Sequence, residues 1–267
     1  MIQNNGLQNI ADQYLFGDSD IAAQRLRVVA EVFAETSRSF VLDAVIAKPE
    51  TVVDLGCGPG YTTRLLAEAL GCNRTIGFDK SDHFISLAKK TAHDSISFLV
   101  HDVTSVPFPV GPSDLLYCRF LLSHLKNPKT LLTRWETQLK PHGLILIDEV
   151  ESIQTNNLTF AAYLEIVAAM LANQSAELYV GPIVNRFTNT ANLEKRVSQV
   201  SRLRVSNRQA AKMFYLNMQS WKSQPFVRGA SSPSVISGLE QKLSAMINSG
   251  GGAEIEWGLR QIVFQRR

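Results

Sequence analysis

Val53-Asp-Leu-Gly-Cys-Gly-Pro-Gly-Tyr61 is the stretch of sequence that decides the fold. An apolar strand runs into a turn with glycines at alternate positions, and apolar residues at helical spacing follow over 61–70. Glycines let the backbone turn sharply and let a ligand approach the main chain without a Cβ in the way. The first amides of the helix are free to face that ligand. The stretch predicts a Rossmann-like strand–loop–helix unit that binds a ligand at its glycine loop.

Strands and helices alternate on either side of this unit. We expect strands at 51–55, 75–79, 96–100, 114–118, 144–147, 201–206 and 256–265. We expect helices at 21–33, 61–70, after a Ser81 N-cap, and at 128–139 (closed by 141–143), 158–171, 208–221 and 235–247. Short apolar strands separated by helices indicate a parallel sheet covered on both faces. The predicted fold class is α/β: a Rossmann-like seven-stranded, mostly parallel sheet with helices on both faces and a helical cap.

The chain is short enough to form one domain overall, with three segments. Residues 1–45 are expected to form an N-terminal helical lid, and 46–155 the Rossmann-like core that binds a cofactor. Residues 156–267 are expected to supply a helical cap insertion and the final strands of the sheet.

The composition excludes several kinds of partner. With 267 residues, a net charge of +3 and 19% charged residues, the chain has a globular composition, and it has no long Lys/Arg run for nucleic acid. No apolar stretch approaches the roughly 20 residues of a membrane span. Three cysteines without a C-x-x-C pair favour neither a disulfide framework nor a zinc site. We therefore expect a cytoplasmic protein with no nucleic-acid or membrane partner, and we leave monomer and homodimer open.

The glycine spacing indicates the kind of ligand. Dinucleotide folds use G-x-G-x-x-G to face a pyrophosphate, whereas this loop reads G-x-G-x-G and continues with Tyr61. Asp54 precedes the first glycine by two residues, and a carboxylate suits a cationic group better than a phosphate. This spacing predicts that the loop binds the amino-acid end of a ligand.

Acidic residues also stand at the ends of the next two strands. Asp79 ends the second strand, where a carboxylate can accept both ribose hydroxyls. Asp102 follows the third strand and can accept a hydrogen bond from an adenine amino group, with Val103 beside the ring. The alternative is that each aspartate caps the helix after it. Taken in order, the three acids favour one ligand made of an amino acid, a ribose and a base.

Several segments together resemble one enzyme family. They are Asp54–Gly60, Gly77–Asp79, His101–Val103, Tyr117–His124 and Leu139–Leu146, with a further likeness in Tyr14–Ser19 followed by Arg25-Leu26. These segments resemble the class I S-adenosylmethionine-dependent methyltransferases, in particular the small-molecule branch that includes ubiquinone and menaquinone biosynthesis enzymes. The resemblance covers about residues 10–150 and implies S-adenosyl-L-methionine as cofactor.

The resemblance also assigns site residues. It implies that the glycine loop wraps the methionine part, that Asp79 holds the ribose, and that Asp102 and Val103 hold the adenine. Lys80 and Phe84 would border the adenosine, Arg119 would approach the methionine end through its backbone, and Tyr14 would close the pocket. The implied cofactor-binding set is Tyr14, Asp54, Gly56, Cys57, Gly58, Gly60, Asp79, Lys80, Phe84, Asp102, Val103 and Arg119.

His124 is the best candidate for a catalytic base, because it follows the fourth strand at the ligand-binding edge and its ordinary pKa is near neutrality. The alternative is a loop histidine with a structural hydrogen bond. Asp148, Glu149 and Glu151 end the fifth strand at the same edge, but such acids more often cap a helix or face solvent.

We predict a metal-independent methyltransferase that acts on a small organic metabolite. The segment after the fourth strand, Cys118-Arg119-Phe120, has neither the Asn/Asp-Pro-Pro-Tyr of nucleic-acid amino methyltransferases nor the acidic metal ligands of catechol-type enzymes. The alternatives are a nicotinamide-dependent oxidoreductase and a non-catalytic S-adenosylmethionine-binding protein.

Overall fold

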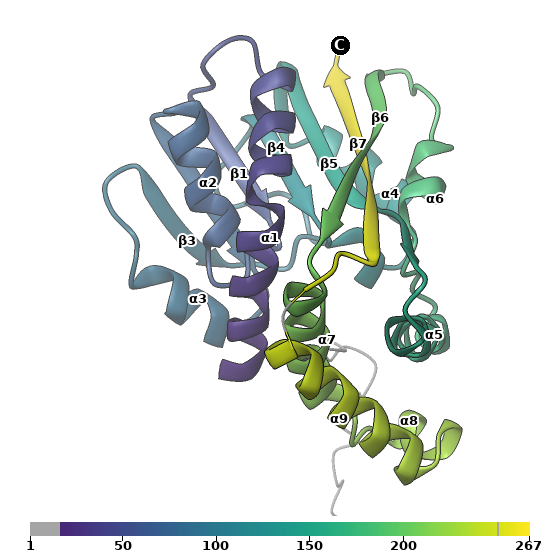
Figure 1. Ribbon diagram of the computed structural model, residues 1–267. Helices are drawn as coiled ribbons and strands as arrows, with labels where there is room; N and C mark the ends of the chain where they lie inside the picture. The colour runs from purple at the N-terminus through teal and green to yellow at the C-terminus, as the bar shows by residue number, and fades with distance from the viewer. Residues whose placement is uncertain (1–16, 250) are drawn as a thin grey trace, which may run out of the picture.

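A seven-stranded sheet forms the centre of the molecule in the computed structural model, which describes residues 17–249 and 251–267 (Figure 1). The strands are β1 (Thr51–Leu55), β2 (Arg74–Asp79), β3 (Ile96–Val100), β4 (Ser113–Arg119), β5 (Leu139–Thr155), β6 (Leu193–Val205) and β7 (Ile255–Arg266). Their order is β3-β2-β1-β4-β5-β7-β6. The pairs among β1 to β5 are parallel, and β7 is antiparallel to both β5 and β6. The predicted Rossmann-like, mostly parallel sheet is confirmed.

Helices cover both faces of this sheet, because its strands are apolar on both sides. The helices on the two faces are α1 (Asp20–Ala44), α2 (Tyr61–Leu70), α3 (Asp82–Lys89), α4 (Pro128–Glu136) and α6 (Gly181–Asn185). Val52 belongs to a core cluster with Phe40 of α1 and Leu66 of α2. The next residue, Val53, points to the opposite face and belongs to a cluster with Trp135 of α4.

A helical layer lies beyond one end of the sheet (Figure 1). It consists of α5 (Leu158–Asn173), α7 (Asn207–Trp221), α8 (Pro225–Ala230) and α9 (Pro233–Ser249). The chain enters this layer between β5 and β6 and again between β6 and β7. Aromatic side chains fill its core: Phe214 of α7 stacks on Tyr163 of α5 with ring centroids 4.0 Å apart. This layer is the predicted helical cap.

Four elements differ from the sequence expectation in their limits by three residues or more. β5 begins at Leu139 and takes in residues 141–143, which were expected to close the preceding helix, and α4 ends at Glu136. β5 and β6 are also longer than expected, because each extends as a ribbon paired with β7, where polar residues alternate with apolar ones. α1 continues past Phe33 to Ala44, since Phe40 and Val41 bury a second apolar stretch against the sheet.

Candidate active site

The glycine loop between β1 and α2 has the backbone geometry that its sequence predicts. Gly56, Gly58 and Gly60 all have left-handed conformations, with φ angles of 70°, 52° and 83°. A Cβ atom at Gly56 would lie 2.7 Å from Leu121 Cδ1, and one at Gly60 would lie 2.7 Å from Phe98. Glycine is therefore required at these positions by both conformation and packing.

A cavity of about 1210 Å³ opens next to this loop, at the carboxyl ends of the parallel strands. Its wall comes from the glycine loop, from the segments after β2, β3 and β4, and from α1, α5 and α7. The predicted site residues on this wall are Gly56, Cys57, Gly58, Asp79, Lys80, Phe84, Asp102, Val103, Arg119 and His124. The topology thus brings most of the predicted set to one cavity.

Two members of the predicted set do not line the cavity, and a third lies outside the described residues. Asp54 and Gly60 are not among the residues that line the cavity. Asp54 is buried, accepts a 2.7 Å hydrogen bond from the Thr63 hydroxyl of α2, and has its pKa raised by burial to about 7. Asp54 thus lies behind the loop and ties it to α2. Tyr14 lies outside the described residues.

Asp79 connects the end of β2 to the glycine loop. One carboxylate oxygen accepts from the amide of Gly58 at 2.9 Å, and the other accepts from the amide of Ser81, also at 2.9 Å. Ser81 in turn caps α3 by accepting from the amide of Phe84, as its sequence position predicts. Burial raises the pKa of the Asp79 carboxyl, and the two amides oppose that rise. The carboxylate is therefore fixed at the cavity wall by backbone bonds.

Asp102 and Val103 lie at the end of β3. Asp102 is exposed, and one of its oxygens accepts from both the amide and the hydroxyl of Thr104, at 2.8 Å each. Val103 is buried, and its carbonyl accepts from the indole of Trp135 at 2.8 Å. The turn is thus held from both sides, and both Asp102 and Val103 line the cavity.

Arg119 ends β4 and joins three segments of the site. Its guanidinium donates to the Ser37 hydroxyl of α1 at 3.0 Å and to the Thr62 hydroxyl of α2 at 2.9 Å. Since Thr62 lies in the first turn after the glycine loop, Arg119 positions α1 against that loop. The resemblance assigned a role to the backbone of Arg119; its side-chain bonds to Ser37 and Thr62 could not be found from sequence spacing.

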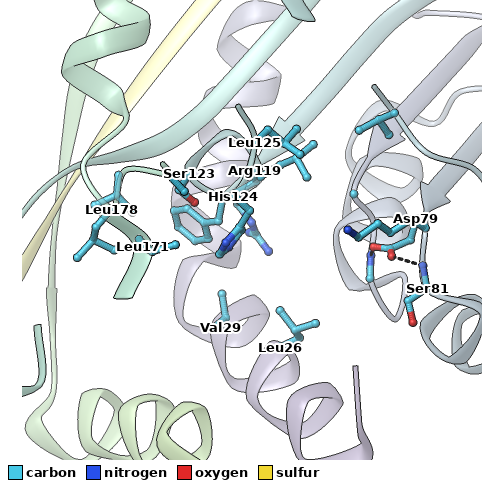
Figure 2. Close-up of a pocket in the computed structure, with 18 of the residues that line it drawn as sticks. Leu26, Val29, Asp79, Ser81, Arg119, Ser123, His124, Leu125, Leu171 and Leu178 are labelled. Atoms are coloured by element: carbon cyan, nitrogen blue, oxygen red, sulfur yellow. Dashed lines mark hydrogen bonds between the residues drawn. The ribbon is translucent and has the colours of Figure 1, made fainter. Parts of the chain in front are cut away.

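His124 lies in a 3-10 turn, η2 (Leu122–His124), near the middle of the cavity. In Figure 2, Asp79 and Ser81 lie on one side of His124, and Leu171 and Leu178 lie on the other. Burial is the main cause that lowers the pKa of His124 to about 3, and the charges of Arg25 and Lys80 add to it. The imidazole is therefore neutral near neutral pH and can act as a hydrogen-bond acceptor.

The three acids that were expected to end the fifth strand lie inside β5 and make structural bonds. Asp148 accepts from the hydroxyls of Ser37 and Tyr117, and Glu151 pairs with Arg260 at 2.6 Å. Glu149 accepts from the amides of Leu121 and Leu122, both at 2.7 Å. None of the three is among the residues that line the cavity. Glu149 was missed as a site-shaping residue because its partners lie in the turn after β4, far from it in sequence.

The far end of the cavity carries a polar chain whose contacts the sequence did not predict. Asn217 of α7 accepts from the Arg25 guanidinium of α1 at 3.0 Å and donates to the Tyr163 hydroxyl of α5 at 2.6 Å. All three side chains line the cavity, with Val29 of α1 and Leu171 of α5 nearby on the same wall. This polar chain therefore joins three helices at an otherwise apolar end.

Residues 17–249 and 251–267 contain no group of three or more His, Cys, Asp or Glu side chains arranged to hold a metal ion. Within the same ranges, no helix has the length and apolar character needed to cross a bilayer.

Comparison with known proteins links the site to one family. Residues 53–147 match a family model described as a methyltransferase domain. Phosphoethanolamine N-methyltransferase 3 of Arabidopsis thaliana is 32% identical over 172 residues, which are 61% of this chain and 34% of the relative. Trans-aconitate 2-methyltransferase of Methylobacterium nodulans is 31% identical over 144 residues, 54% of this chain and 50% of the relative. The chain thus spans between a third and a half of the length of these relatives.

A solved structure supports the fold. Coclaurine N-methyltransferase, crystallised with N-methylheliamine and S-adenosylhomocysteine, superposes with a TM-score of 0.54 over 87% of this chain and 72% of its own, at 14% identity. The family match covers the glycine loop and the ends of β2, β3 and β4. Residues 53–147 thus match a methyltransferase domain, and the chain shares its overall fold with a solved methyltransferase.

Proposed function

We propose that this chain transfers a methyl group from S-adenosylmethionine to a small organic molecule. One observation carries the proposal: the glycine loop and the ends of β2 and β3 line one end of a single cavity, within the segment that matches the methyltransferase domain. The relatives named above act, by their names, on phosphoethanolamine and trans-aconitate, which supports a small-molecule acceptor.

The residues at this end fit the cofactor. The glycine loop offers a close approach to the main chain, because Gly56 and Gly58 line the cavity and carry no side chain. Asp79 offers a fixed carboxylate to the ribose hydroxyls, and Asp102 offers an oxygen to the adenine amino group. We propose that Val103, Phe84 and Lys80 border the adenosine, and that Cys57 and Arg119 lie at the methionine end. Asp54 and Gly60 act by shaping the loop. We also propose that Tyr14 closes the pocket from the N-terminal lid.

The chemistry requires positioning more than proton transfer. When bound, S-adenosylmethionine supplies an electrophilic methyl group: an acceptor lone pair bonds to the methyl carbon as the carbon–sulfur bond breaks, and that electron pair leaves on sulfur. The cavity wall aligns the acceptor and excludes water. We propose that His124, neutral because burial lowers its pKa to about 3, accepts a hydrogen bond from the acceptor and orients it. A pKa this low makes the imidazole a weak base, so its predicted role as catalytic base is replaced in this proposal by positioning.

The remaining predictions form part of the same proposal. We propose that the reaction needs no metal and takes place in the cytoplasm, and that neither nucleic acid nor a membrane is a partner. The chain acts as a monomer or as a homodimer. We also keep the three segments 1–45, 46–155 and 156–267 as lid, core and cap. Sedimentation of the purified chain distinguishes monomer from dimer.

Calorimetry with S-adenosylmethionine, S-adenosylhomocysteine and NAD⁺ tests the cofactor. We expect the native protein to bind the first two ligands and not NAD⁺. Asp79→Ala should weaken both affinities by about tenfold or more, since it removes the carboxylate that accepts the ribose hydroxyls. Asp82→Ala is the matched control, because Asp82 is an exposed acid nearby that is not on the cavity wall, and it should leave both affinities unchanged.

Thermal melting of each variant separates loss of binding from loss of folding, and Asp79→Asn provides a second test that keeps the side-chain shape. Undiminished affinity in a folded Asp79→Ala variant, or tighter binding of NAD⁺ than of S-adenosylmethionine, would overturn the proposal. Release of S-adenosylhomocysteine with a panel of metabolites then distinguishes an enzyme from a non-catalytic binding protein.

A further inference from the structure

We infer that the methyl acceptor is a predominantly apolar molecule that carries a single polar group, bound between α1, α5 and α7. The inference rests on the proposed function, because it assigns the cofactor to the glycine-loop end of the cavity. It names the class of molecule that the opposite end accepts.

The opposite end is predominantly apolar; besides Arg25, Asn217 and Tyr163, its polar members are Asn173, which ends α5, and the following Gln174 and Ser175. Its wall includes Phe33 from α1, Val167 and Leu171 from α5, Phe214 from α7 and Trp257 from β7. These side chains belong to the core cluster of the helical cap, and each is less than a tenth exposed. Apolar walls favour apolar ligands, because removing apolar surface from water contributes about 25 cal/mol for each Å².

The volume leaves room for a second molecule. Ligand cavities commonly measure about 300–1,000 Å³, and this one measures about 1210 Å³. Figure 2 places Leu171 and Leu178 on the side of His124 away from Asp79. A cofactor at the loop end therefore leaves the space beside Leu171 and Leu178 for the acceptor.

Charge is unevenly distributed over the wall. Arg25, Asn217 and Tyr163 form the polar chain at the apolar end, and among the described wall residues Arg25 is its one charged member. The other charged side chains belong to the segments after β2, β3 and β4 and to α4, apart from Asp18, which bonds to Ser81 on the loop side. Several carboxylates or phosphates placed at the apolar end would lose their hydration without matching partners, and burying unpaired charge is costly. The wall therefore disfavours a multiply charged acceptor.

The polar chain defines where one polar group fits. Asn217 is held in one orientation, since its oxygen accepts from Arg25 and its amide donates to the Tyr163 oxygen. Burial raises the pKa of Tyr163 to about 12, so that its hydroxyl keeps its proton and can donate it. A single hydroxyl, carbonyl or amine on the acceptor can contact this site while the rest of the molecule meets apolar side chains.

Binding to protein saturated with S-adenosylhomocysteine tests the inference. The probes are 2-naphthol, an aromatic body with one hydroxyl, and tricarballylate, a compact molecule with three carboxylates. We expect calorimetry to detect binding of 2-naphthol and none of tricarballylate. Leu178→Glu should weaken 2-naphthol binding by about tenfold or more, because it places a charge on the apolar wall.

Leu178→Met is the matched control, since it keeps an apolar side chain of similar volume, and it should bind 2-naphthol within about threefold of the native protein. Leu178 is only half-buried, so the charged variant is expected to fold. S-adenosylhomocysteine affinity should be the same in all three proteins, because Leu178 lies away from the loop end (Figure 2).

Two results would overturn the inference: tighter binding of tricarballylate than of 2-naphthol, or equal 2-naphthol binding by the Glu and Met variants. Failure of 2-naphthol to bind the native complex counts against it as well. Failure of the native protein to bind S-adenosylhomocysteine is a different outcome, since it would remove the proposed function on which the inference rests.

Discussion

Glu149 holds the turn after β4, in which Phe120 and Leu121 line the cavity. Its carboxylate accepts from the amides of Leu121 and Leu122 at the point where Phe120 takes a left-handed conformation, with φ of 53°. The Leu121 side chain packs at the position that a Cβ of Gly56 would occupy. A change at Glu149 is therefore transmitted through Leu121 to the glycine loop.

Glu149→Ala is expected to destabilise the fold and to weaken cofactor binding. The substitution leaves two amides without their acceptor, and each unsatisfied buried group costs about 1–3 kcal/mol. Glu149→Gln is the control. Burial raises the pKa of Glu149 to about 8, so the native side chain is largely protonated at neutral pH, and glutamine resembles that form.

Urea unfolding and S-adenosylhomocysteine calorimetry measure the two effects on both Glu149 variants. We expect Gln to lose less than half of what Ala loses in unfolding free energy, and to keep the native affinity. Identical behaviour of Ala and Gln would show that the two amide bonds have no role in holding the turn.

Single residues at strand ends could be predicted from the sequence, but their orientation could not. Asp79 and Asp102 were assigned from their places at the ends of two strands, and both line the cavity. Asp54 lies one residue before the end of β1 and turns toward Thr63, because successive strand residues point to opposite faces. Its burial beside α2 required knowledge of which helix covers that face.

At the scale of elements, α1 serves two parts of the molecule. Its first half lines the cavity with Arg25 and Val29, whereas its second half packs on the sheet through Phe40 and Val41. Ser37 lies between the halves, donates to the Asp148 carboxylate at 2.8 Å and accepts from Arg119 at 3.0 Å. The helix is thus fixed to the sheet beside the cavity.

Ser37→Ala should lower the free energy of unfolding by about 1–3 kcal/mol, because it removes one partner from a buried carboxylate and one from a guanidinium. Ser39→Ala is the matched control: Ser39 is exposed on the same helix, and alanine has the same helix propensity at both positions. Urea midpoints of the two variants give the difference. A Ser37→Ala variant as stable as Ser39→Ala would mean that the contact with Asp148 contributes nothing.

Element types were predictable where apolar residues have a clear period, and element lengths were not. The core strands β1 and β3 have the limits that their apolar runs predict. β6 runs over Leu193–Val205, yet the sequence indicated only its last residues, because residues 196–200 are exposed and give no apolar signal of a buried strand. Pairing with β7 extends it, and such pairing depends on residues more than fifty positions away.

At the scale of the whole molecule, the two ends of the cavity come from differently predictable parts of the chain. The loop end lies within residues 53–147, where the family match is, and its motifs are short and local. The apolar end combines α1, α5 and α7, which lie outside that segment. Their side chains meet only in the folded chain, so the sequence predicted a cap but not the contacts among Arg25, Asn217 and Tyr163.

Buried acids also give the whole molecule a pH-dependent stability. Burial raises the pKa of Asp54 from 3.8 to about 7 and that of Glu149 from 4.5 to about 8. Between its unfolded and its folded pKa, each carboxyl group binds more protons in the folded chain than in the unfolded chain. The free energy of unfolding therefore falls as pH rises through that interval. His124 acts in the opposite direction, because its pKa is lowered from 6.5 to about 3, but that contribution is complete above about pH 6.5.

Between pH 6.5 and pH 8 the two acids therefore dominate, and the unfolding free energy of the ligand-free protein should fall by about 1–2 kcal/mol. Urea unfolding at these two pH values measures the change. The double variant Asp54→Asn/Glu149→Gln has no carboxyl at either position, and its stability should vary less over the same interval. A native protein that becomes more stable toward pH 8, or a double variant with an unchanged slope, would contradict the assignment of the pH dependence to these buried carboxyls.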